Sequence, residues 1–120
     1  TTQVVSQIGS RHMEVIERGG EMLRSNRYVR RSWLGEDMLS RGTWSEPIIV
    51  LAPEPDACYP DGQPLPQPYC LLEGHHRLGY LRSMATDELP LQPEHQVWIC
   101  RPVRDTQTFL PANPASEINF

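Results

Sequence analysis

The stretch Leu71–Met84 reads LLEGHHRLGYLRSM, and it decides the fold because a short apolar run, a glycine turn and a helical repeat follow one another there. The apolar run predicts the end of a strand. Leucine and methionine then recur every three to four residues, so we expect a helix from residue 75 to about residue 84. Gly74 therefore stands where a strand turns into a helix.

The rest of the chain predicts a small α/β (α+β) fold, with helices packed on a short mixed sheet. Its apolar runs and helical repeats suggest alternating elements. The Gly19-Gly20 pair weakens the pattern of the first helix, which is either continuous or broken at the glycines. In chain order, the predicted elements are helices at 13–23 and 28–40, strands at 47–51 and 69–72, the helix at 75–84 and a strand at 96–100. The prediction is one domain over residues 1–104, with 105–120 as a loosely packed tail.

Residues 52–68 separate two predicted strands and contain six prolines and one Asp61-Gly62 pair. Such a density of prolines excludes a helix or a central strand, because proline lacks the backbone N–H that both need. We therefore expect an exposed, partly stiff hairpin insertion, turning at the Asp-Gly pair.

The charged residues argue against a surface built mainly to bind nucleic acid, because the formal net charge is -4. All 11 basic residues are arginine. Four of them, Arg24, Arg27, Arg30 and Arg31, form an arginine stretch. It is either a solvated helix face or a local phosphate-binding patch that contacts DNA.

The three cysteines, Cys58, Cys70 and Cys100, show neither CxxC spacing nor a Cys-His ligand pattern. This pattern favours reduced thiols in a cytoplasmic protein over a disulfide framework or a zinc site, so no metal ligands are predicted. No apolar run approaches the roughly 18 residues of a membrane span, and no membrane partner is expected. Because the sequence begins without methionine, the chain can be a fragment of a longer product.

Isolated aromatic and histidine residues receive structural interpretations. Trp33, Trp44 and Trp98 fall on or beside predicted elements, which favours core packing over base stacking. His12 and His95 are isolated in the sequence and are expected to be exposed.

The segment Glu73–Arg77, EGHHR, carries the predicted chemistry. Glycine lets the backbone turn sharply and a ligand approach closely. The free N–H groups of the following helical turn, with the positive end of the helix dipole, form an anion site. His75, His76, Arg77 and, one turn later, Arg82 add basic side chains. A phosphate is therefore the expected ligand, contacted by the backbone N–H groups of residues 75 to 77.

The string EGHHRLGYL resembles the box of the ParB/sulfiredoxin superfamily, in which a glycine and a polar-Arg pair open a helix. The resemblance covers residues 29–101, since members place a strand like Pro47–Leu51 and a hairpin before the box. In sulfiredoxins the box reads glycine-cysteine-histidine-arginine, so Gly74, His76 and Arg77 match. His75 occupies the cysteine position, which removes the redox nucleophile and argues against sulfinic-acid reduction.

Other branches of the superfamily are similar to this stretch in different ways. Free-serine kinases carry an acid-glycine-histidine-histidine-arginine box and a separate upstream glutamate as base, for which Glu21 and Glu36 are the candidates here. ParB partition proteins have a glycine-acid-arginine-arginine box and a second, DNA-binding domain. Single-domain relatives include nucleases and plasmid fertility-inhibition proteins of the Osa type. That branch implies ATP hydrolysis and DNA cleavage.

The resulting hypothesis is a phosphate-bond hydrolase that acts on ATP, DNA or both, in plasmid conjugation or fertility inhibition. Glu73 positions water or Mg²⁺, His75 or His76 acts as general acid or base, and Glu36 is a further catalytic candidate. Gly74, His75, His76, Arg77 and Arg82 are expected to bind the nucleotide. The alternatives are a nucleotide-binding regulatory module that holds a protein partner, and a phosphotransferase similar to the free-serine kinases.

Overall fold

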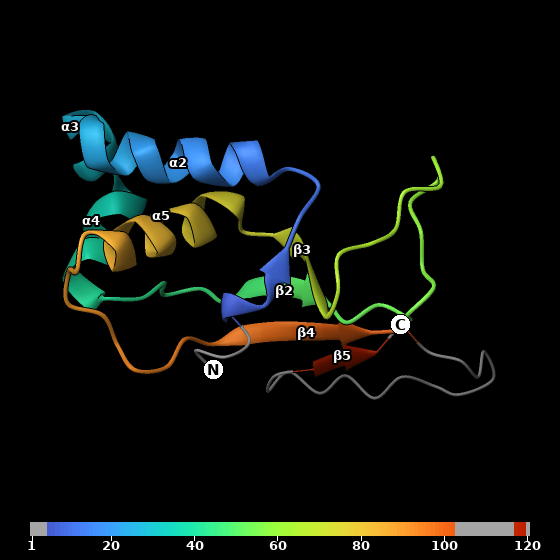
Figure 1. Cartoon of the computed structure of the whole chain (residues 1–120). Helices are drawn as coiled ribbons and strands as arrows, with labels where there is room; N and C mark the ends of the chain where they lie inside the picture. Colours follow the sequence, from blue (N-terminus) through green and yellow to red (C-terminus); the bar gives the residue numbers. More distant parts are fainter. Residues whose placement is uncertain (1–4, 103–116, 120) are drawn as a thin grey trace.

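Helices form one layer and a sheet forms the other in the computed structural model, which describes residues 5–102 and 117–119 (Figure 1). The small α/β fold class predicted from the sequence is confirmed. The helices are α2 (Met13–Ser25), α3 (Arg27–Arg30), α4 (Trp33–Arg41) and α5 (His75–Thr86). The strands are β1 (Ile8–Gly9), β2 (Ile48–Leu51), β3 (Tyr69–Glu73), β4 (Val97–Arg101) and β5 (Glu117–Asn119).

The strands lie in the order β1-β3-β2-β4-β5. The central pair, β2 and β3, is antiparallel, whereas β2 and β4 run parallel with Ile48 opposite Val97. The first strand, β1, has two residues and is too short for periodicity to reveal it. The last strand, β5, pairs with β4 and falls within the predicted tail, whose other residues lie mainly outside the described part of the chain.

The core fills the space between the two layers. Apolar residues of β2 and of the buried face of α5 supply its centre, with contributions from α2 and α4. The most deeply buried side chains are Ile16, Met38, Ile48, Leu78, Met84 and Val50. The helical spacing predicted for residues 78, 81 and 84 is therefore the spacing of a buried face.

The first helix is not broken at its glycines, because α2 is continuous from residue 13 to residue 25. Its two glycines are buried against α5. A Cβ on Gly20 would lie 2.6 Å from the carbonyl oxygen of Gly79, and one on Gly19 would lie 3.4 Å from the ring of His76. The glycines permit close contact between the helices, and this packing outweighs their poor helix propensity.

The predicted helix at 28–40 is two helices, because Ser32 interrupts it. The Ser32 side chain caps α4 by accepting a hydrogen bond of 3.1 Å from the Gly35 N–H. A Cβ on Gly35 would overlap the Val29 carbonyl oxygen at the end of α3. Serine and glycine therefore fix a tight corner between α3 and α4.

Two structural interpretations of single residues are wrong. Trp33, expected in the core, is 70% exposed because it is the first residue of α4 at this corner. His95, expected to be exposed, is buried, with its Nδ1 2.7 Å from the Thr43 hydroxyl and its ring 5.6 Å from that of Trp44. Trp44 is buried as expected, and its indole N–H donates to the Gln96 carbonyl.

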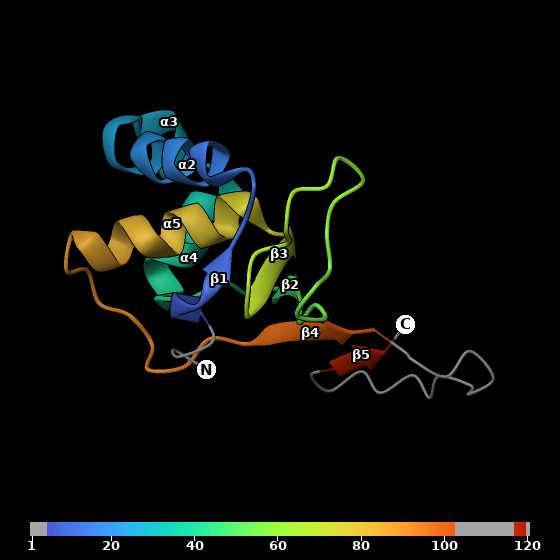
Figure 2. The same ribbon diagram turned by 45° about the vertical axis from the view of Figure 1, so that its right-hand side comes forward.

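Residues 52–68 form the predicted hairpin insertion, which projects from the sheet (Figure 2). Backbone bonds join Tyr59 to Gln63 and Leu65 to Ala57. Gly62, at the expected turn, has a φ of 88°. An ion pair between Arg11 and Asp61 connects the tip to the segment before α2.

Gly74→Ala is expected to destabilise the protein more than Gly62→Ala. Both positions have positive φ, which penalises alanine by about 1–3 kcal/mol. Only at Gly74 would the new Cβ meet a packed neighbour, the Cγ2 of Ile48 at 2.5 Å, whereas nothing lies within 4 Å at Gly62. The overlap should add about 1–3 kcal/mol, measurable by urea unfolding. Equal losses in the two variants would show that Ile48 does not constrain the turn.

Candidate functional site

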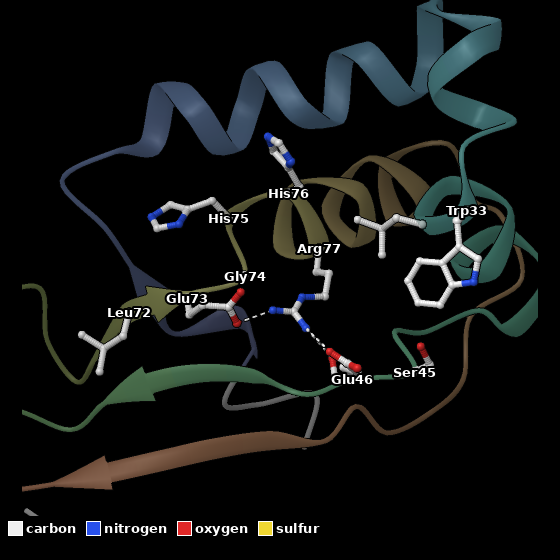
Figure 3. A pocket seen from close by; sticks show the side chains of 10 residues that line it. Trp33, Ser45, Glu46, Leu72, Glu73, Gly74, His75, His76 and Arg77 are labelled. Atoms are coloured by element: carbon white, nitrogen blue, oxygen red, sulfur yellow. Dashed lines mark hydrogen bonds and ion pairs between the residues drawn. The ribbon is translucent and has the colours of Figure 1, made fainter.

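A cleft of about 570 Å³ opens where β3 ends and α5 begins (Figure 3). The turn into α5 forms one wall, and the segment before β2 and the start of α4 form the others. Its lining residues are Trp33, Leu34, Ser45, Glu46, Leu72, Glu73, Gly74, His75, His76 and Arg77. The whole segment Glu73–Arg77, singled out in the sequence, thus borders one cavity.

Gly74 makes the turn in the left-handed region, with φ 107° and ψ 31°. Its carbonyl accepts the first helical bond, from the Leu78 N–H at 2.9 Å. The backbone N–H groups of residues 75 to 77 lie in the first turn, where no carbonyl of the helix can accept a hydrogen bond from them. Gly74 has no side chain to cap them. These donors, with the positive end of the helix dipole, are the backbone part of an anion site.

Arg77 lies in the first turn of α5 with a side chain that is only 12% exposed. Its guanidinium forms an ion pair with Glu73 and donates a bond of 3.1 Å to the Glu46 backbone carbonyl (Figure 3). The Glu46 carboxylate lies 3.9 Å from the same group. The guanidinium is therefore held at the cleft by Glu73, at the end of β3, and by Glu46, just before β2.

The partners of Arg77 differ in how firmly they hold it. The side chains of Glu73 and Glu46 are 58% and 82% exposed, and exposed ion pairs contribute little because water competes for both charges. The Glu46 carbonyl belongs to the fixed backbone beside β2. A stronger anion can thus replace the carboxylates while the carbonyl keeps the guanidinium in place.

The two histidines of this segment turn away from Arg77. Figure 3 shows the His76 ring directed toward α2 and the His75 ring on the side of the turn opposite Trp33. His76 stacks on Tyr80, with ring centroids 6.2 Å apart, and His75 lies 5.9 Å from His12. The side chains that face the cleft together are thus Glu73 and Arg77, joined by Glu46 and Trp33.

The pKa of His75 lies below the ordinary value for histidine. Burial lowers it, and the neighbouring His12 and His76 lower it further. Its Nε2 atom is buried without a hydrogen-bond partner in the described part of the chain. A neutral imidazole with an unused nitrogen is able to accept a hydrogen bond or a proton from a ligand that reaches it.

Three residues predicted for the site lie elsewhere. Arg82 donates a bond of 2.9 Å to the Ile8 carbonyl, where it connects α5 to β1. Glu36 borders a separate depression on α4 with Arg30, and Glu21 lies in another, between α2 and α5. Glu36 and Arg82 therefore do not join Arg77 in the cleft.

The arginine stretch lies at the turn from α2 to α3. Arg24 pairs with Asp87 at 3.1 Å, and the guanidinium of Arg27 lies 5.1 Å from the ring centroid of Tyr28. All four arginines are exposed. None of the four lines the cleft.

Sequence reasoning missed Glu46 and Trp33 as cleft residues. Glu46 directly precedes the predicted strand at 47–51, so its place beside the turn follows once β2 and β3 are paired. Trp33 gave no such signal, because its position depends on the corner at Ser32.

Comparisons with family models, curated proteins and solved structures found no match for this chain. The resemblance to the ParB/sulfiredoxin superfamily therefore stays a prediction from the sequence motif.

Over the described residues, no three His, Cys, Asp or Glu side chains are grouped to hold a metal ion, and no helix is long and apolar enough to cross a membrane. No disulfide joins the three cysteines; Cys58 is exposed, and Cys70 and Cys100 are buried.

Acidification is expected to lower the free energy of unfolding. Burial lowers the pKa of both His75 and His95 in the folded protein, whereas the unfolded chain binds protons near the ordinary value of about 6.5. The stability linked to these neutral imidazoles is fully present above about pH 6.5 and is lost as the pH falls below it. Urea unfolding between about pH 7.5 and 5.5 measures this loss. His75→Gln should flatten the dependence, and stability that rises on acidification would contradict it.

Proposed function

We propose that this protein is a phosphate-bond hydrolase of the ParB/sulfiredoxin type, which hydrolyses ATP, cleaves DNA or does both. The observation that carries the proposal is the cleft at the start of α5, where free backbone N–H groups and the guanidinium of Arg77 converge. Backbone donors at a helix start and a charged fork are the groups that proteins use to hold phosphate.

Phosphate binding is possible because Arg77 has one partner that is easily displaced, the exposed Glu73 carboxylate, and one that is not, the Glu46 carbonyl. A nucleotide phosphate accepts hydrogen bonds from the N–H groups of residues 75 to 77 and displaces the exposed Glu73 carboxylate from the guanidinium. The Glu46 carbonyl, 3.1 Å from the guanidinium, continues to orient it. Gly74 permits this approach because it carries no Cβ.

Hydrolysis uses the carboxylate that binding releases. Glu73, freed from Arg77, accepts a proton from a water molecule whose oxygen attacks the terminal phosphorus. The bond to the bridging oxygen breaks, ADP leaves, and Arg77 stabilises the charge that develops on the transferred group. His75, with its unused Nε2, is the second candidate for proton transfer.

Magnesium is compatible with this site. Mg²⁺ in nucleotide sites is bound by one or two carboxylates together with phosphate oxygens. Glu46 and Glu73 both border the cleft and offer such oxygens. The ion would supply further neutralisation of the phosphate charge.

DNA is the second substrate, and the arginine stretch supports it as a surface for phosphate contacts. A role in plasmid conjugation or fertility inhibition rests on the resemblance alone, and the unpaired cysteines support a cytoplasmic location. A nucleotide-binding regulatory module with a protein partner, or a phosphotransferase like the free-serine kinases, would use the same cleft. Release of inorganic phosphate from ATP separates a hydrolase from a binding module, and release without an acceptor separates it from a phosphotransferase.

Arg77→Ala is expected to weaken ATP binding far more than Arg82→Ala. A lost charge-assisted hydrogen bond corresponds to about 1.5–3 kcal/mol, or roughly ten- to hundredfold in affinity. Arg82 instead contacts the Ile8 carbonyl outside the cleft, so its loss should affect stability. Isothermal titration and phosphate release on both variants test this, with thermal unfolding as the control for folding. Equal losses of affinity would move the site away from the start of α5.

Glu73→Gln is expected to tighten ATP binding several-fold while lowering kcat. The change removes a negative charge that competes with phosphate for Arg77, and it also removes the proton acceptor, a group that contributes about 10²–10⁴ in rate. Glu88→Gln, with the same change of charge beyond the far end of α5, is the control and should alter neither. Weaker binding in Glu73→Gln would show that the carboxylate supports the ligand instead of competing with it.

A further inference from the structure

Trp33 is a large aromatic side chain that the fold leaves in water, with 70% of its surface exposed. It borders both the cleft at the start of α5 and the adjacent depression on α4 that contains Glu36. Figure 3 shows its indole across the cleft from Arg77. An exposed tryptophan loses the favourable free energy of burying its apolar surface. Because aromatic side chains commonly line ligand pockets, a ligand in the cleft is the partner that would cover this indole.

The backbone holds this indole in place. Trp33 is the first residue of α4, directly after the Ser32 cap, whose side chain accepts from the Gly35 N–H and donates to the Val29 carbonyl. Gly35 lets the end of α3 pack against the first turn of α4. The indole therefore has only its own two torsions to order when it binds a ligand.

The cleft has a charged end and an aromatic end. The start of α5, with its N–H groups and Arg77, lies at the first, and Trp33 and Leu34 of α4 lie at the second. A nucleoside triphosphate has the same division, with charged phosphates at one end and a flat base at the other. The volume of about 570 Å³ accommodates such a molecule.

We propose that Trp33 is the platform on which the nucleotide base stacks while the phosphates occupy the start of α5. The proposal rests on the proposed function and adds the recognition of the base to that of the phosphates. Stacking on an aromatic face accepts every base, so affinity should follow stacking area, with purine above pyrimidine nucleotides.

The test compares ATP with inorganic tripolyphosphate, which has the phosphates without the base. Trp33→Ala should weaken ATP binding about 5- to 100-fold and leave tripolyphosphate binding unchanged, since alanine removes only the stacking. Trp33→Phe should retain most of the ATP affinity. Tyr28→Ala is the matched control, because Tyr28 is equally exposed, at 71%, but lies outside the cleft.

Fluorescence supplies an independent readout. ATP should quench the tryptophan emission of the native protein and tripolyphosphate should not. The quenching should disappear in Trp33→Phe, because Trp44 is buried and the half-buried Trp98, on β4, does not line the cleft.

The failures of the two proposals are distinguishable. If native protein binds neither ATP nor tripolyphosphate, the proposed function fails, and the base platform with it. If tripolyphosphate binds but Trp33→Ala weakens both ligands or neither, the phosphate site stands and the base platform is wrong. Circular dichroism of each variant confirms that the fold is intact.

Discussion

The close contact between Gly74 and Ile48 is the constraint on which the site depends. Gly74 has no Cβ, so the turn from β3 into α5 lies directly on the side chain of Ile48, the first residue of β2. Glu46 lies two residues before Ile48, so this contact also brings the start of α5 beside Glu46. The Glu46 carbonyl accepts a hydrogen bond from Arg77. The position of the guanidinium therefore depends both on the pairing of β2 with β3 and on the glycine turn.

Local patterns were sufficient to predict the turn, because strand, glycine and helix follow one another within a few residues. They were also sufficient for the Pro-rich insertion and for the buried face of α5. They failed where distant segments decide the outcome. The contact with α5 keeps α2 continuous through Gly20, and a pocket beside Trp44 buries His95. Both depend on packing partners that periodicity does not contain.

The candidate site shows the same division. Gly74 and Arg77 were predicted from the turn and the first helical turn. Arg82 was added because it follows one turn later on the same helix, and Glu36 because the resemblance implies an upstream glutamate. Arg82 is five residues beyond Arg77, on a different side of α5, where it binds the backbone of β1. Glu46 and Trp33 come from other elements and reach the cleft only through the fold.

An acidic chain can hold an anion because its charges are arranged locally. The carboxylates of Glu73 and Glu46 flank Arg77 near the positive end of the α5 dipole, so its largely buried guanidinium has anionic partners within the chain. Both carboxylates are exposed and can return to water when a phosphate replaces them. A bound phosphate thus replaces a carboxylate as the anionic partner of the guanidinium, and only the difference between the two interactions contributes to the free energy of binding.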